Sequence, residues 1–148
     1  QCPAEKDKEQ LRSYGMSAQW WCPYTKSDNS VLDSDPGMSF KKIEDIKNPS
    51  EKFMFIDAQG QMRDGYFAIY CNSFSWWNIP STNHSDGTVN GFADGHVEQY
   101  KFDKGTAQNA RDSLANGGGF GMDRGPITEG EKEDLRYFQR ATWGKTAG

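Results

Sequence analysis

Residues 83–98, which read NHSDGTVNGFADGHVE, constrain the fold of this chain more than any other segment. Two runs that can form strands, residues 88–93 and 96–102, are separated by Asp94-Gly95. This dipeptide tolerates the positive φ angles that a two-residue type I′ turn requires. The segment therefore predicts a β-hairpin.

The predicted register places apolar pairs across the hairpin and makes it half buried. The pairs are Ala93 with His96, Phe92 with Val97, and Val89 with Tyr100. His84 precedes the first strand and Asp94 ends it, so the strand length sets the distance between imidazole and carboxylate. We interpret His84 and Asp94-Gly95 as a structural clasp that fixes the two ends of one strand.

Length and composition favour one domain spanning residues 1–148 in the α+β class, a small antiparallel sheet with short peripheral helices. Sixteen glycines, six prolines and 14% aromatic residues are typical of short strands, many turns and an aromatic core. The net charge of -4 argues against nucleic acid and anionic membranes as partners. No apolar run approaches the roughly 20 residues of a membrane-spanning helix, so we expect no membrane insertion by this fragment.

Three further segments have the composition of strands: residues 13–21, 52–57 and 66–71. The second is the most apolar segment of the chain and ends in Asp57, which predicts the central strand. Between the strands, residues 72–83 form an aromatic loop.

Helical segments are short in this sequence. Ser39 is placed to cap one turn that buries Phe40, Ile43 and Ile46. Thr106 is placed to cap a helix that ends at Asn116, before Gly117. Thr128 and Glu131 have the spacing of a capping box for a last helix over residues 131–141, with Leu135 and Phe138 on one face and Trp143 just past its end.

The three cysteines, Cys2, Cys22 and Cys71, lie far apart and form no C-x-x-C pair, which argues against a zinc site or a redox dithiol. We predict an exported protein with a disulfide between Cys22 and Cys71, leaving Cys2 to pair upstream. The alternative is three reduced cysteines in a cytosolic domain.

Histidine and carboxylate residues raise the hypothesis of a metal site, formed by His84, Asp94 and His96 with Asp57 or Asp86. A metal-dependent hydrolase would need these side chains to meet at one point, and their spacing in the sequence does not imply this. A calcium site of Asp57, Asp86 and Asp94 is a second hypothesis, because calcium prefers oxygen ligands on loops. The favoured interpretation assigns no cofactor. The serine-nucleophile motif G-x-S-x-G and the zinc-protease motif H-E-x-x-H are both missing from the sequence.

Two tryptophan pairs, Trp20-Trp21 and Trp76-Trp77, suggest a different function. Exposed aromatic rings on loops can stack on sugars or partners. An extracellular carbohydrate-binding or ligand-binding β module is therefore the alternative function, unless one ring of each pair belongs to the core.

His84, nine residues, and Asp94-Gly95 together closely resemble the prepilin-type, processing-associated His-x9-Asp-Gly family of type II pseudopilin-like proteins. Four other segments resemble the family in the same order along nearly the whole chain. They are Cys2-Pro3-Ala4-Glu5, Ser13-Tyr14-Gly15-Met16, the Asn48-Pro49-Ser50-Glu51 turn leading to Asp57, and the tail over residues 134–143.

The resemblance implies a non-enzymatic, pilin-like subunit of a cell-surface or secretion-associated filament. In that family a prepilin signal and a long hydrophobic helix precede an antiparallel sheet that packs on the helix. Neither is found in residues 1–148, so we expect this sequence to be the globular C-terminal part of an inner-membrane-anchored precursor. Its expected partners are its own N-terminal helix or other pilin-like subunits, in a homo-oligomer or filament outside the cell.

Overall fold

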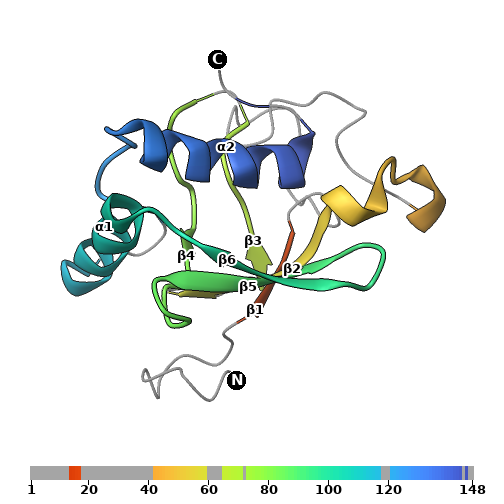
Figure 1. Ribbon diagram of the computed structural model, residues 1–148, viewed down its shortest axis with the longest axis horizontal. Helices are drawn as coiled ribbons and strands as arrows, with labels where there is room; N and C mark the ends of the chain where they lie inside the picture. The colour runs from red at the N-terminus through yellow and green to blue at the C-terminus, as the bar shows by residue number, and fades with distance from the viewer. Residues whose placement is uncertain are drawn as a thin grey trace.

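The computed structural model describes residues 14–17, 42–59, 65–71, 73–117, 121–144 and 146. They form an α+β fold with a mixed six-stranded sheet and two short α-helices (Figure 1), which confirms the predicted class. The strands are β1 (Tyr14–Ser17), β2 (Phe53–Gln59), β3 (Tyr66–Phe67), β4 (Ile79–Pro80), β5 (Gly87–Phe92) and β6 (Val97–Lys101). The helices are α1 (Lys104–Ala115) and α2 (Glu129–Trp143), with 3-10 turns η1 (Ile43–Asp45) and η2 (Pro49–Glu51).

Strand β2 is the centre of the sheet, as its apolar sequence predicted. The strand order is β3-β1-β2-β5-β6, and β4 pairs with the end of β2. The pairing of β1 with β3 is parallel and the other pairings are antiparallel. The sheet is mixed because the chain passes β1 after β2, so that β3 pairs with the edge of β1 that faces away from β2. Residues 68–71 were also predicted as strand, but they continue as irregular chain.

The β5–β6 hairpin is confirmed, but its predicted turn is wrong by one residue. Gly95 N donates to Phe92 O at 3.0 Å and Phe92 N donates to His96 O at 2.9 Å. The loop therefore has three residues, and Gly95 adopts φ +94°. This is the turn followed by a left-handed residue that three-residue hairpin loops favour.

One contact at the turn explains the extra loop residue. Ala93 N donates to Lys52 O at 2.9 Å, so Ala93 binds the residue directly before β2 instead of pairing with His96. The shifted register pairs Gly91 with Val97 and Thr88 with Tyr100. A one-residue shift changes every cross-strand partner, so the predicted apolar pairs do not form.

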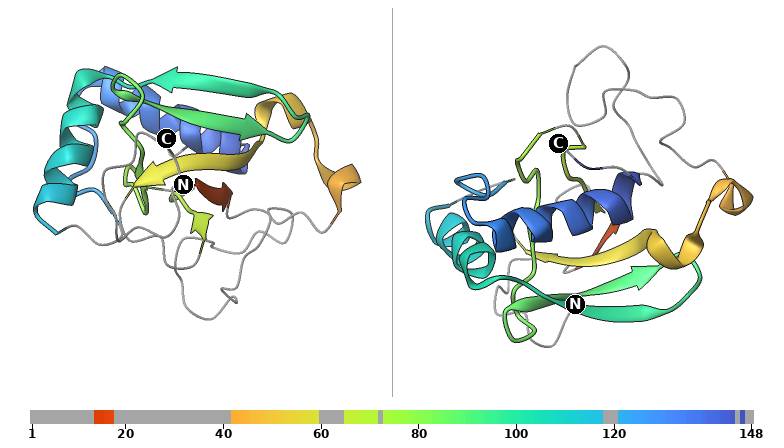
Figure 2. Two further views of the ribbon diagram at one scale, coloured as in Figure 1. Left: turned by 90° about the horizontal axis from the view of Figure 1, so that it is seen from below. Right: turned by 45° about the horizontal axis from the view of Figure 1, so that its top comes forward.

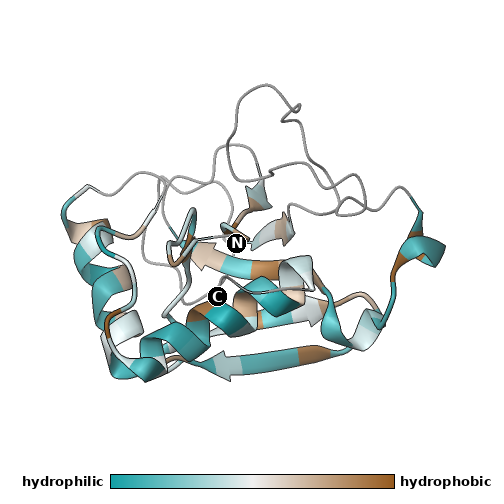
Figure 3. Ribbon diagram, turned by 90° about the horizontal axis from the view of Figure 1, so that it is seen from above, coloured by the Kyte–Doolittle hydropathy of each residue, from teal (hydrophilic) through white to brown (hydrophobic). Residues whose placement is uncertain are grey.

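Helix α2 lies across one face of the sheet (Figure 1), and from below the sheet lies in front of it (Figure 2). Its buried face includes Leu135 and Phe138, both 0% exposed. The Phe138 ring lies 5.2 Å from the Phe53 ring and 6.0 Å from the Phe67 ring. The opposite surface of α2 is largely hydrophilic (Figure 3), as expected of an amphipathic helix.

Polar side chains of α2 fasten the helix to the segment after β3. Gln139 Nε2 donates to Tyr70 O at 2.7 Å and to Ser73 O at 2.9 Å. Trp143 Nε1 donates to Ile69 O at 2.7 Å. Trp143 was predicted to lie past the helix end, but it is the last helical residue and is buried.

The predicted capping box of α2 is confirmed. Thr128 Oγ1 accepts from Glu131 N at 3.2 Å, and Glu131 Oε2 accepts from Thr128 N at 2.9 Å. Gly144 ends the helix with φ +76°. Both ends of α2 therefore have the local contacts that satisfy terminal backbone groups.

The predicted cap of α1 is wrong, although the helix itself is confirmed. Asp103, not Thr106, is the N-cap, and its carboxylate accepts from Gly105 N at 2.8 Å. Thr106 lies inside the first turn and is buried. Gly117 follows the helix with φ +76°, as predicted.

The predicted apolar face of residues 41–46 does not form. Ile43 is 58% exposed, whereas Ile46 is buried. Ile46 is the C-cap of η1 in an extended conformation, so its side chain leaves the helical face that Ile43 shares. Phe40 lies outside the described residues. Within the described ranges, no helix is both long and apolar enough to cross a membrane.

Candidate functional site

The loop before β5 brings His84 to the central strand. His84 Nε2 lies 3.0 Å from Asp57 Oδ2, and the side chain of Asp57 is 2% exposed. Asp57 follows Ile56, whose side chain lies in the core, so the Asp57 side chain lies on the sheet face opposite α2. His84 therefore binds a carboxylate of β2 instead of depending on Asp94 at the far end of β5.

Backbone contacts hold the same loop against β2. Ser81 N donates to Asp57 O at 3.1 Å, and Thr88 Oγ1 donates to the same oxygen at 2.7 Å. Gln99 Nε2 of β6 donates to His84 O at 2.9 Å. The segment that carries His84 is thus fixed from two strands, which supports the clasp interpretation of this residue.

The turn after His84 has an unusual backbone. Ser85 and Asp86 are consecutive non-glycine residues with φ of 55° and 64°. Asp86 Oδ1 accepts from Arg111 Nη1 of α1 at 2.6 Å, and Asp86 O accepts from Phe102 N at 2.9 Å. Asp86 therefore connects this turn to α1.

Asp94 and His96 form a separate contact at the opposite end of β5. Asp94 Oδ1 lies 2.6 Å from His96 Nδ1 and accepts from His96 N at 3.1 Å. The hydrogen bond from the His96 backbone is the main cause that lowers the pKa of Asp94. The His96 ring stacks on Phe92 at 4.1 Å, so His96 completes the turn. Gly95 adopts the positive φ on which the clasp interpretation relied.

The predicted metal ligands do not converge. Asp57 contacts His84, Asp86 contacts Arg111, and Asp94 contacts His96 at the far end of β5. Among the residues that the structure describes, no group of three or more His, Cys, Asp or Glu side chains is arranged to hold a metal ion. The calcium site and the metal site of a hydrolase therefore lack the geometry on which each hypothesis depended.

One of the four tryptophans predicted to be available for ligand stacking is buried. Trp76 is 4% exposed, and its ring lies 5.4 Å from that of Phe138 in the core. Trp77 is half-buried and packs edge-on against Tyr70. Trp20 and Trp21 lie outside the described residues. The interpretation that one ring of a pair belongs to the core therefore holds for Trp76.

Cys71 lies in the core and is 3% exposed. Cys22 and Cys2 lie outside the described residues, so the Cys22–Cys71 disulfide stays a prediction.

The sheet face opposite α2 exposes a row of apolar side chains that the sequence argument did not identify. Cross-strand pairing joins Met16 to Phe55, Phe55 to Gly91, and Gly91 to Val97. Phe55 is 50% exposed and Val97 is 67% exposed. Tyr14, on the same face, is 45% exposed. Alternation along residues 55–57, with Ile56 pointing to the core, was the signal that could have revealed this row, whereas the register shift between Phe53 and Phe55 places Phe53 in the core as well.

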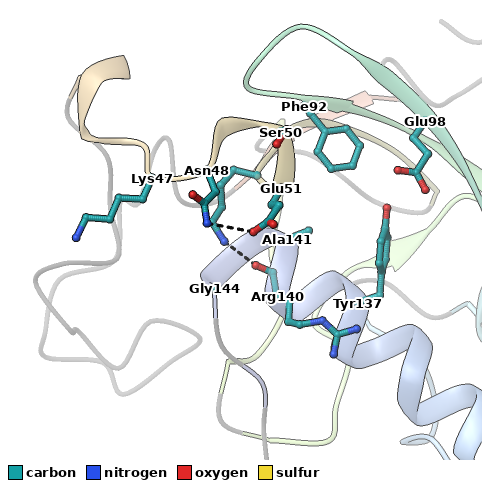
Figure 4. A pocket seen from close by; sticks show the side chains of 11 residues that line it. Lys47, Asn48, Ser50, Glu51, Phe92, Glu98, Tyr137, Arg140, Ala141 and Gly144 are labelled. Atoms are coloured by element: carbon teal, nitrogen blue, oxygen red, sulfur yellow. Dashed lines mark hydrogen bonds between the residues drawn. The ribbon is translucent and has the colours of Figure 1, made fainter.

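A cavity of about 570 Å³ is a second feature that the sequence argument missed. It lies between η2, the hairpin and the C-terminal half of α2 (Figure 4). Phe92, Glu98 and Tyr137 lie on one side, and Glu51 and Arg140 lie on the others. These residues come from segments far apart in sequence, so no local motif marks the cavity.

In comparisons with known proteins, no family model, curated protein or solved structure matches this chain.

Proposed function

We propose that the chain is a non-enzymatic, pilin-like subunit or head domain of a filament at the cell surface or in secretion. The observation that carries this proposal is the exposed apolar row on the sheet face opposite α2. Phe55 occupies the middle of this row, on the central strand. Large exposed apolar patches mark sites of protein association.

The His-x9-Asp-Gly resemblance supplies the kind of partner that this face would meet. In a pilin-like subunit, a long hydrophobic helix packs against the sheet. Helix α2 covers the other sheet face, so the row of Met16, Phe55 and Val97 is the surface proposed to receive that helix. The helix belongs either to an upstream part of the same protein or to a neighbouring pilin-like subunit.

The contacts of the motif residues support a non-enzymatic role. His84 joins β5 to β2 through Asp57, and Asp94 closes the β5–β6 turn with His96. Both motif residues therefore serve to hold the sheet together. The proposed location is extracellular or at the cell surface, with an inner-membrane-anchored precursor.

Sedimentation velocity across a concentration series tests the proposed association surface. We expect concentration-dependent self-association of the chain, weakened about tenfold or more in Phe55→Ser, because burying a phenylalanine contributes roughly 1.5–3 kcal/mol. Ile127→Ser is the matched control, since Ile127 is 68% exposed but precedes α2. A chain that stays monomeric at all concentrations, or equal effects of the two variants, would contradict the proposal.

A further inference from the structure

The cavity between η2, the hairpin and α2 has the dimensions of a small-molecule site. Its volume of about 570 Å³ lies within the range of 300–1,000 Å³ that is typical of ligand pockets. Phe92 and Ala141 give it an apolar surface, and both are buried. Tyr137 forms one wall with its ring, stacked at 4.0 Å on Tyr100 (Figure 4). The residues that form the cavity walls are therefore held in place by packing in the core.

Charged groups of both signs line the same cavity. Glu98 lies above Tyr137, and Glu51 lies across the cavity from them (Figure 4). Lys52 Nζ donates to Arg140 O at 2.8 Å, and burial lowers the pKa of Lys52. The Arg140 side chain is 53% exposed and reaches Glu133 at 3.9 Å, so its guanidinium keeps hydrogen-bonding capacity.

Polar groups lie beside one wall of the cavity. Asn90 is buried and pairs across the hairpin with Glu98. The Tyr137 hydroxyl lies between these two residues and hydrogen-bonds with the side chains of both. This end of the cavity is therefore polar, whereas Phe92 and Ala141 make the rest of the wall apolar.

The Tyr137 hydroxyl shares this end of the cavity with Glu98. Burial, and after it the charge of Glu98, raise the pKa of Tyr137 above its usual value. Tyr137 therefore keeps its proton at neutral pH, beside the Glu98 carboxylate.

We propose that this cavity binds a small zwitterion, an α-amino acid or a short peptide, with its ammonium at Glu98 and its carboxylate at Arg140 and Lys52. A simple anion would meet the two glutamates, and a simple cation would meet Lys52 and Arg140. A zwitterion pairs with both signs at once, while its side chain packs on Phe92 and Ala141. This site lies on the α2 side of the sheet and does not depend on the proposed filament function.

The experiment titrates the full chain, labelled with ¹⁵N, with four probes and follows its amide chemical shifts. The probes are L-leucine, leucyl-leucine, N-acetyl-L-leucine and L-leucinamide. We expect saturable shifts at cavity residues with leucine or its dipeptide. Each analogue that lacks one charge should bind about tenfold more weakly, because hydrogen bonds to charged groups are the strong contacts. Whether leucine or leucyl-leucine binds more tightly distinguishes an amino acid from a peptide chain.

Two exposed side chains test the assigned contacts. Glu98→Gln should weaken leucine binding about tenfold without changing the affinity for N-acetyl-L-leucine, which has no ammonium group. Arg140→Gln should weaken leucine binding about tenfold without changing the affinity for L-leucinamide, which has no carboxylate. Glu44→Gln and Arg111→Gln are controls outside the cavity and should leave binding unchanged. The proposal is overturned if neither leucine nor its dipeptide saturates below about 10 mM, far weaker than typical specific binding. Equal binding of the capped analogues, or unchanged affinity in both cavity variants, also overturns it.

Discussion

His84 Nε2 lies 3.0 Å from Asp57 Oδ2, and this contact joins the loop before β5 to the central strand of the sheet. The first residue of the His-x9-Asp-Gly motif is therefore a cross-strand contact. Its second part, Asp94-Gly95, forms the turn at the other end of β5. The two ends of one strand are held by separate histidine–aspartate contacts.

Replacing His84 by alanine should destabilise the chain by about 1–3 kcal/mol, because the buried Asp57 carboxylate loses its close polar contact with the imidazole. Equilibrium unfolding in urea at pH 7 measures this change. His96→Ala is the control, since its contact with Asp94 is exposed, and should cost less than about 1 kcal/mol. Equal losses in both variants, or no loss in His84→Ala, would contradict the clasp.

Replacing Gly95 by alanine should cost about 1–2 kcal/mol through backbone strain alone. Gly95 has φ +94°, and nothing lies within 4 Å of an added Cβ atom. Gly91→Ala is a matched control in the same hairpin, because its Cβ would make ordinary contact with Phe55 at 3.8 Å. Thermal unfolding of both variants should show the larger loss in Gly95→Ala. A larger loss in Gly91→Ala would be inconsistent with the three-residue turn.

Stability should fall as the pH drops from 4.5 towards 2 because of Glu131. The hydrogen bond from Arg124, followed by those from the Ile127 and Thr128 backbone, lowers the pKa of Glu131 from 4.5 to about 2. A carboxyl with a lower pKa in the folded state contributes stability above its unfolded pKa and loses it as the pH falls. The contribution is about 3 kcal/mol at most, from the size of the shift.

Urea unfolding at several pH values measures this effect. The free energy of unfolding should fall more steeply in the unmodified chain than in Glu131→Gln between pH 4.5 and 2. Glu129→Gln is the control in the same helical turn, and its pH dependence should resemble that of the unmodified chain because Glu129 is 73% exposed. Coincident slopes for the unmodified chain and Glu131→Gln would rule out this role.

Replacing Trp76 by alanine should destabilise the chain by about 3–5 kcal/mol, as expected for a large aromatic side chain removed from a core. Phe74→Ala, in the same loop, should cost less than about 1 kcal/mol, because Phe74 is 40% exposed and its ring lies against the Arg136 guanidinium instead of in the core. Urea unfolding measures both losses. A small loss in Trp76→Ala would return this ring to the candidates for ligand stacking.

Local patterns predicted the elements whose signals lie within a few residues. The spacing of Thr128 and Glu131 identified the start of α2, and Gly117 identified the end of α1. The apolar run of residues 52–57 identified the central strand. In each case neighbouring residues determine the conformation, so the sequence alone was sufficient.

The errors arose where distant contacts decided between local alternatives. Asp94-Gly95 fits both a two-residue and a three-residue loop, and the bond from Ala93 N to Lys52 O favours the longer one. Asp103 and Thr106 are both able to cap α1. The contact of Asp57 with His84 depends on which strand lies beside β5, and no spacing within residues 83–98 contains that information. The cavity beside Tyr137 was missed for the same reason.

The position of β2 also has a consequence for how the chain folds. Among the described strands, a short loop joins only the paired strands β5 and β6, whereas β2 pairs with β1, β4 and β5 across long intervening segments. Hairpins form within microseconds, but pairings that close long loops are slow. We therefore expect the β5–β6 hairpin to form first and β2 to dock on it later. A chain cut between β2 and β5 would keep its fastest element and lose its sheet.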